Sequence, residues 1–330
     1  MRKEESSKEK VSQVFSTARI YALLSIVSAH IYFPNTFAGQ VFNRFGTLGV
    51  IVFLMISGYY FRTEKFVDWK NLAVKKAHSI LVPWLVCGTL TWLYNAILSP
   101  LNRSFLGWLN WLLGNGSYLY YLTILLLCLA LLFKAGKLII CLTLPLTVAS
   151  ILLTSFGVFE PILAFLHINN YLNLFNWIGF FGAGMLLQKI SEETIFSFLK
   201  KGRIWFLAIF SLLFSILLFF PNIKTDYFSF LAIPFEILGG LAILGLSTWR
   251  LTGCKFFQLL AGASFPIYLL HIVFIGLFDQ LLNQFIITRI FSPVIIIMFV
   301  FGIIMLFKVL SKILKMEKVF SLVTGMRNLK

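Results

Sequence analysis

Long apolar stretches alternate with short polar ones along the whole chain. The apolar stretches run approximately over residues 18–35, 46–61, 78–98, 116–133, 138–156, 172–188, 204–220, 228–248, 264–285 and 290–310. A helix of about 20 apolar residues spans the hydrocarbon core of a bilayer, and a helix satisfies its own backbone hydrogen bonds in lipid. The pattern therefore predicts an all-α polytopic bundle of about ten transmembrane helices.

The basic residues indicate how this bundle crosses the membrane. Lysine and arginine alternate between the connections, with 24 on one side of the predicted bundle and 4 on the other. Cytoplasmic connections carry the excess of positive charge, so both termini are predicted to be cytoplasmic. We expect a cytoplasmic N-terminal segment over 1–17, one membrane domain over 18–310 and a basic cytoplasmic tail over 311–330. The tail is amphipathic, which favours an anchor on the anionic inner leaflet.

Composition excludes several classes of protein. The chain of 330 residues is 59% hydrophobic and 12% charged, whereas soluble domains carry about 25% charged residues. A net charge of +16 would suggest nucleic acid for a soluble protein, but here it follows the topology, so no nucleic-acid partner is expected. The run after residue 19 contains a histidine and no small-x-small cleavage site, which favours a retained helix over a signal peptide. The four cysteines show no CxxC spacing and predict buried thiols, with no metal site.

Three ionisable side chains fall within the predicted spans, namely His30, Glu236 and His271. Such groups are expensive in lipid and mark functional sites, although a single histidine can equally be structural. Imidazole can take or give a proton near neutral pH, and both histidine-bearing helices are predicted to run outward from the cytoplasm. Arg19 lies 11 residues before His30, on the same face of a helix and about 16 Å away along its axis.

Other segments have two interpretations each. The basic segment 62–77, with Lys75 and Lys76, follows from the topology alone or forms a phosphate site. Glycines in the second span allow close helix packing or close approach of a ligand to the backbone. Aromatic residues over 99–118 indicate an interfacial helix in the aromatic belt or a rim that faces carbohydrate.

Four blocks resemble the acyltransferase 3 family of bacterial integral-membrane acyltransferases. They are Arg19 to His30, the glycine-rich block Gly46 to Gly58, the basic block Lys75 to Pro83, and Ser264-Phe-Pro-Ile-Tyr-Leu-Leu-His271. Gly116 to Leu122 is a weaker fifth match, and His78 stands where family members commonly have lysine or arginine.

The resemblance implies an acyl-CoA-dependent O-acyltransferase of the bacterial cytoplasmic (inner) membrane, embedded in membrane lipids. Acetyl-CoA or another acyl-CoA would donate the acyl group, without a metal, to a sugar hydroxyl of a lipid-linked or surface glycan. By position, Arg19, Lys75 and Lys76 would hold the coenzyme phosphates. His30 would be the catalytic base or transient acyl carrier, and His271 a second catalytic-site residue.

Two other functions remain open from the sequence. One is a transporter or flippase of lipid-linked sugars, in which His30, Glu236 and His271 form a proton relay. Transporters often contain paired broken helices in two repeats, and no such pair is evident. The other is a non-catalytic membrane subunit of a polysaccharide assembly system.

Overall fold

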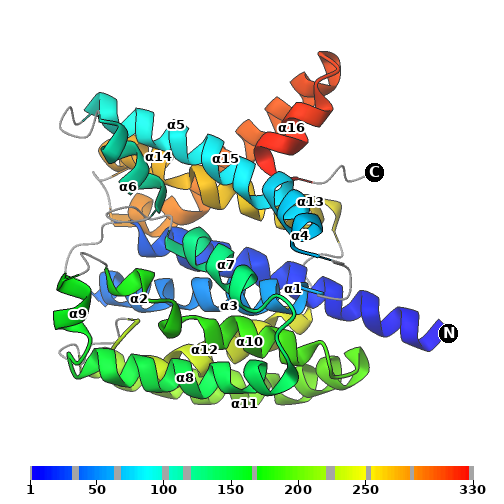
Figure 1. The fold of residues 1–330 in the computed structure, drawn as a ribbon, viewed down its shortest axis with the longest axis vertical. Coiled ribbons are helices and arrows are strands. Elements are labelled where there is room, and N and C mark those ends of the chain that lie inside the picture. Colours follow the sequence, from blue (N-terminus) through cyan, green and yellow to red (C-terminus); the bar gives the residue numbers. More distant parts are fainter. Residues whose placement is uncertain are drawn as a thin grey trace. The chain divides into compact units, whose positions relative to one another are not determined.

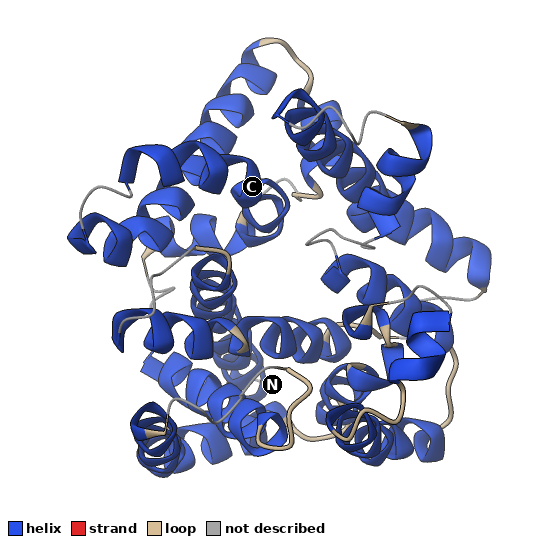
Figure 2. Cartoon of the chain, turned by 90° about the vertical axis from the view of Figure 1, so that its left-hand side faces the viewer, coloured by secondary structure: helices blue, strands red, loops and turns tan. Residues whose placement is uncertain are grey.

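The computed structural model of the protein describes residues 2–31, 37–62, 68–98, 104–113, 120–165, 169–220, 227–249, 254–282 and 286–326. In these ranges every regular element is a helix and no strand occurs (Figure 2). Among the described residues, seven helices are long and apolar enough to cross a membrane, or eight if the bent pair Lys255–Gly262 and Ser264–Phe278 is one span. An all-α polytopic helical bundle is therefore confirmed.

Two shorter apolar helices, Tyr120–Leu131 and Ile178–Leu187, coincide with the predicted spans 116–133 and 172–188. Whether they complete ten crossings is not decided by their length, because 12 and 10 residues are fewer than the roughly 17 that a spanning helix needs. The number of crossings and the side of the termini remain predictions.

The first helix differs from its predicted limits. Helix α1 runs over Arg2–Ala29, so it includes most of the polar segment 1–17 and stops before residue 35. The polar segment is rich in lysine and glutamate, which are good helix formers. At the other end, α1 stops at Ala29. His30 therefore lies in the turn directly after α1, and its predicted position deep within a helix was wrong.

The predicted outer loop 36–45 is also helical. It forms α2, Phe37–Gly46, which a single residue, Thr47, separates from α3, Leu48–Tyr59. The break exposes carbonyl groups at the end of α2, and the hydroxyl of Ser25 in α1 donates to the carbonyl of Phe45 at 2.7 Å. Arg44, expected in an exposed loop, is only 6% exposed.

The chain divides into two units. Unit 1 comprises residues 1–29, 33–63 and 124–261, and unit 2 comprises 30–32, 64–123 and 262–330. Besides α1 to α3, unit 1 contains α8 Lys137–Ser155, α9 Glu160–Phe165, η4 Asn170–Leu172, η5 Leu174–Asn176, α10 Ile178–Leu187, α11 Glu192–Phe219, α12 Ala232–Leu246, η6 Ser247–Trp249 and nearly all of α13, Lys255–Gly262. Unit 2 contains α4 Trp69–Lys76, η2 Ala77–Leu81, α5 Val82–Leu98, α6 Phe105–Leu113, α14 Ser264–Leu282, α15 Ile286–Ile313 and α16 Glu317–Thr324. Helix α7, Tyr120–Leu131, contributes to both units.

Helix α3 is the centre of unit 1 and packs against α1, α10 and α12 (Figure 1). It is apolar on all sides, as expected of a helix surrounded by other helices. Its glycines permit close approach: a Cβ on Gly49 would meet the carbonyl of Ala22, and a Cβ on Gly58 would meet the carbonyl of Phe181. The structural interpretation of the glycine-rich block therefore holds at these two positions.

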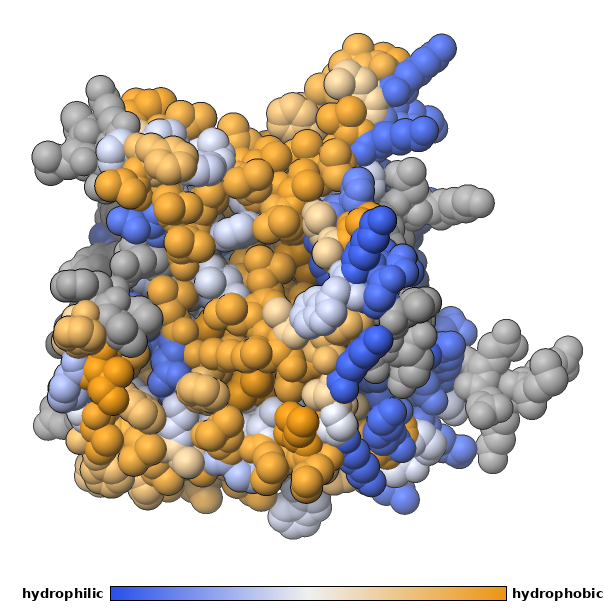
Figure 3. Space-filling view, in the orientation of Figure 1, coloured by the Kyte–Doolittle hydropathy of each residue, from blue (hydrophilic) through white to orange (hydrophobic). Residues whose placement is uncertain are grey.

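Helices α8 and α11 form an apolar outer face of unit 1. Exposed side chains on α11 include Ile204, Trp205, Leu212 and Phe219, and only 6% of its most apolar window is buried. The space-filling view shows this hydrophobic surface over α8 and α11, with hydrophilic side chains gathered at the end of the unit where α1 begins (Figure 3). Such a surface is soluble only in lipid, so the helices of unit 1 cross the membrane with this face outward.

In unit 2, helix α5 packs against α6, α14 and α16. The indole N–H groups of Trp108 and Trp111 in α6 donate to the hydroxyls of Thr89 and Thr91 in α5, at 3.0 and 3.1 Å. The aromatic segment thus contains a short helix fixed to α5. Tyr118 lies outside the described residues, so the two interpretations of this segment both stand.

The basic tail is helical and packed rather than extended. Helix α16 contacts α5 and α15, and Gly325 follows it with φ of +68°, a backbone conformation that favours glycine. A Cβ at Gly325 would lie 2.8 Å from the carbonyl of Ser79. The tail therefore packs against the start of the span that carries Lys75 and Lys76.

Candidate active site

His30 and His271 lie together in unit 2, with ring centroids 5.3 Å apart and an angle of 49° between the ring planes. Their elements place them independently: His30 follows the end of α1, and His271 lies two turns into α14. The two histidines that the sequence separates by most of its length are therefore neighbours.

The ring of His271 is held in one orientation by its own helix. Its Nδ1 lies 2.6 Å from the backbone carbonyl of Tyr268. A carbonyl can only accept, so Nδ1 is the N–H donor, and the lone pair of the neutral ring is on Nε2. The sequence block Tyr268-Leu-Leu-His271 places donor and acceptor one helical turn apart, which makes this bond local.

Accessibility differs between the two rings. His271 is fully buried at 0% exposure, whereas His30 is exposed. The two rings of the pair therefore differ in how much of their surface is accessible.

Aromatic rings continue from this pair. The ring of Tyr268 lies 5.8 Å from that of His271, and the ring of Tyr121 lies edge-on to Tyr268 at 5.3 Å. Sequence analysis quoted both tyrosines in matching blocks but gave neither a role. Only the structure shows the contact of Tyr121 with Tyr268, because helix periodicity does not relate α7 to α14.

Arg19 lies in unit 1, on α1. Its guanidinium carbon is 5.2 Å from the ring centroid of Tyr60, the residue directly after α3, in a cation–π arrangement. Gln188 fixes the C-terminal end of α3. Its side-chain amide donates to the backbone carbonyls of Gly58 and Phe61 at 2.7 and 2.9 Å. Tyr60 is therefore a rigid support for Arg19, and sequence analysis did not single it out.

Lys75 and Lys76 form the last turn of α4 in unit 2. The following five residues, Ala77–Leu81, form a turn of π-helix, a feature that occurs frequently at functional sites. Lys75 is exposed and Lys76 half-buried, and the hydroxyl of Ser79 donates to the carbonyl of Lys75 at 2.9 Å. Arg19 belongs to unit 1, whereas Lys75 and Lys76 belong to unit 2.

Glu236 lies in α12 of unit 1 and is 1% exposed. Within the described residues, neither of its carboxyl oxygens has a hydrogen-bond partner. Tyr227, which precedes α12, is its neighbour: burial, together with the nearby Glu236 and Tyr171, raises the pKa of the Tyr227 phenol well above its ordinary value. Glu236 belongs to unit 1 and the histidine pair to unit 2, so the structure does not assign them to one site.

No cluster of three or more histidine, cysteine, aspartate or glutamate side chains occurs among the described residues. The cysteines are free thiols there; Cys87 and Cys128 are buried, whereas Cys141 and Cys254 are exposed. The expectation of buried thiols was thus right for two of the four.

Comparison with known proteins supplies the family. A family model described as an acyltransferase domain, that of the acyltransferase 3 family, matches residues 15–311. No curated protein and no solved structure matches the chain. The match covers nearly the whole chain, including all four sequence blocks and both histidines of the pair. The chain therefore belongs to the acyltransferase 3 family and is a multi-pass membrane acyltransferase.

Proposed function

We propose that the protein transfers an acyl group, most simply acetyl, from cytoplasmic acyl-CoA to a sugar hydroxyl of a cell-envelope or exported glycan. The observation that carries this proposal is the His30–His271 pair, with ring centroids 5.3 Å apart in a chain whose family transfers acyl groups. Acyl transfer to a hydroxyl needs a group that removes the hydroxyl proton, and imidazole does so near neutral pH.

In the proposed reaction, the imidazole of His30 takes the proton from the acceptor hydroxyl. The hydroxyl oxygen attacks the thioester carbonyl carbon, the carbon–sulfur bond breaks, and the coenzyme leaves as a thiolate that recovers the proton. His30 is assigned the role of base because it is exposed. His271, buried and bonded to the Tyr268 carbonyl, packs its ring beside that of His30 and so positions the base.

The donor is assigned to the basic side of the protein. Arg19 presents a guanidinium supported by Tyr60, and a guanidinium binds phosphate through two parallel hydrogen bonds. Lys75 and Lys76 supply two further cations beside a π-helical turn. These residues would bind the phosphates of the coenzyme on the cytoplasmic side, where the excess of lysine and arginine is predicted to lie.

The predicted topology also suggests which acceptor and which membrane the protein uses. Transfer from one side to a hydroxyl presented at the other suits a lipid-linked or surface glycan, in the cytoplasmic membrane of a bacterium. The family match favours this function over the transporter and the non-catalytic subunit, because the matched domain is an acyltransferase.

Inverted membrane vesicles, which present the cytoplasmic face outward, test the proposal. Vesicles with wild type, His30→Ala or Arg19→Ala receive radiolabelled acetyl-CoA, and label in the glycan and lipid fractions is measured. We expect transfer by wild type, loss with His30→Ala and a raised requirement for donor with Arg19→Ala. Equal transfer by all three would contradict the proposed site, and no consumption of acyl-CoA of any chain length would contradict the donor. A stable labelled protein would identify His30 as an acyl carrier instead of a base.

A further inference from the structure

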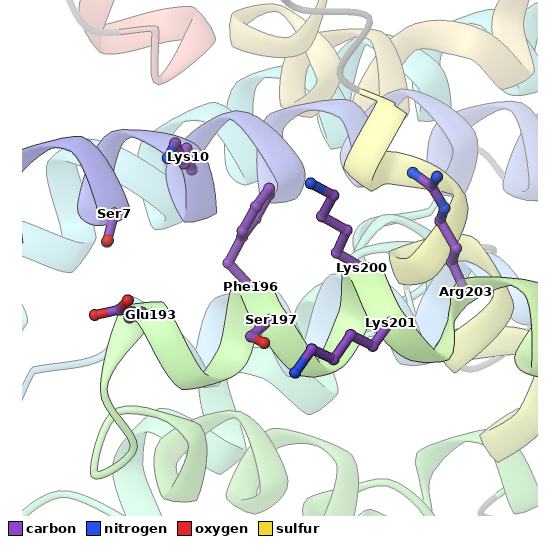
Figure 4. Close-up of a pocket in the computed structure, with 8 residues that line it drawn as sticks. All are labelled: Ser7, Lys10, Glu193, Phe196, Ser197, Lys200, Lys201 and Arg203. Carbon is purple, nitrogen blue, oxygen red and sulfur yellow. The ribbon is translucent and has the colours of Figure 1, made fainter.

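A basic cavity of about 440 Å³ lies in unit 1 between the start of α1 and the first turns of α11. Lys10 of α1 and Lys200, Lys201 and Arg203 of α11 line it, together with the single carboxylate of Glu193 (Figure 4). The four cations repel one another, and the one carboxylate does not balance their charge. An anionic ligand or salt would reduce this repulsion. The cavity is separate from the histidine pair, which belongs to unit 2.

Two of the four cations make cation–π contacts with aromatic rings. The Nζ of Lys10 lies 5.8 Å from the ring centroid of Phe196, and the guanidinium of Arg203 lies 5.5 Å from that of Trp249. In Figure 4 the side chain of Lys200 extends toward α1, and that of Lys201 lies along α11 beside Ser197. In the described part of the chain neither lysine has an ion pair, so their ammonium groups are available to a ligand.

An apolar surface adjoins the cavity. A second hollow of about 740 Å³ shares Glu193, Ser197 and Lys201 with it and continues over Phe198 and Trp205. Phe198 is 56% exposed and Trp205 is 70% exposed, on a helix of which only 6% of the most apolar window is buried. Tryptophan favours the boundary between headgroups and acyl chains. The basic cavity is thus continuous with a surface suited to hydrocarbon.

We propose that this cavity binds the phosphate of an anionic glycerophospholipid, whose acyl chains lie along the exposed apolar face of α11. A soluble phosphate would satisfy the four cations but would leave the exposed apolar surface of Phe198 and Trp205 uncovered. The lysine and arginine residues here belong to segments predicted to be cytoplasmic, and that leaflet attracts basic side chains through its anionic lipids. The proposal is independent of acyl transfer.

Native mass spectrometry of the purified protein tests it. The protein is released from nanodiscs that contain equal amounts of phosphatidylglycerol and phosphatidylcholine, and the retained lipids are counted. We expect wild type to retain phosphatidylglycerol preferentially. Lys200→Gln combined with Lys201→Gln should lower this retention roughly tenfold, since each cation near an anionic headgroup contributes severalfold to binding. Glu193→Gln should raise it, because the opposing carboxylate is removed.

A charge-matched control separates this site from general attraction. Lys308→Gln with Lys312→Gln removes two lysines from α15 in unit 2 and should leave retention unchanged. Equal losses in the two double variants, or no loss in the Lys200/Lys201 variant, would overturn the proposal. Displacement of the lipid by millimolar inorganic phosphate or adenosine 3′,5′-bisphosphate would show a soluble phosphate as the ligand and would overturn it as well.

Discussion

The rings of His30 and His271 lie 5.3 Å apart, and the carbonyl of Tyr268 holds Nδ1 of His271 at 2.6 Å. This bond distinguishes the two nitrogens of His271: Nδ1 fixes the ring to its own helix, and Nε2 carries the lone pair of the neutral ring.

Substitutions that imitate one nitrogen at a time test these roles. In His271→Asn the side-chain amide can still donate to the Tyr268 carbonyl, but no group replaces Nε2. We expect this variant to fold as wild type and to lose about 10²-fold in kcat, because the ring that positions the base His30 is absent. His271→Gln should both lose activity and unfold at lower temperature. Activity of His271→Asn close to that of wild type would remove the ring of His271 from the mechanism.

Arg19 and Tyr60 are expected to act together on the donor. Tyr60→Phe keeps a ring beneath the guanidinium, which lies 5.2 Å from the ring centroid, whereas Tyr60→Leu removes it. We predict that Tyr60→Leu raises the KM for acyl-CoA roughly two- to fivefold, corresponding to a cation–π interaction of about 0.5–1 kcal/mol, and that Tyr60→Phe does not. Arg19→Lys should raise this KM further, because lysine cannot bind phosphate in the two-pronged way of arginine.

Acyl-pantetheine, which lacks the nucleotide phosphates, is the matched substrate for this comparison. If Arg19 binds those phosphates, its replacement leaves the KM for acyl-pantetheine unchanged. An equal rise in KM for both donors would instead assign Arg19 to the structure of the α1–α3 contact.

Gly58 is expected to be intolerant of any side chain. A Cβ there would collide with the carbonyl of Phe181 in α10, and backbone cannot yield as a side-chain tip does. Gly58→Ala should destabilise the protein by about 1–3 kcal/mol, the usual cost of overpacking. Gly302→Ala in α15 is the control, since a Cβ there meets nothing within 4 Å; it should be neutral or slightly stabilising. Thermal unfolding in detergent compares the two, and similar melting temperatures would argue against close α3–α10 packing.

The hydrogen bond between Trp108 and Thr89 should fix α6 to α5. Thr89→Val removes the acceptor of the 3.0 Å bond and should cost about 1 kcal/mol. A double-mutant cycle with Trp108→Phe measures the pairwise contribution in unfolding experiments. Additive effects of the two substitutions would mean that the bond contributes nothing to the attachment of α6.

The alternation of basic residues predicts the side of each connection. Alkaline phosphatase, which folds only after export, should be active when fused after Lys224 and inactive when fused after Lys330, both positions being read from the sequence. Replacement of Lys189, Lys200 and Lys201 by glutamine weakens the positive-inside signal nearby and provides a sensitised background. Activity of the fusion after Lys330 would contradict cytoplasmic termini.

The extents of α1 and α2 differ from the sequence prediction for reasons that lie in their own residues. Hydropathy reports residence in lipid and not helical conformation, and residues 2–17 are largely polar and still helical in α1. Helix α2 was missed because its polar residues Gln40, Asn43 and Arg44 resembled a loop, although Phe37, Val41 and Phe45 repeat every fourth position.

The sequence alone determined that the protein is an all-α polytopic membrane acyltransferase, because runs of apolar residues have few stable conformations in lipid and the ordered blocks identify the family. Tertiary structure alone decided which polar residues meet. The contact of His30 with His271, the support of Arg19 by Tyr60 and the basic cavity between α1 and α11 each join segments distant in the chain. Helical periodicity relates residues within one helix, whereas these contacts depend on how side chains of different helices interlock.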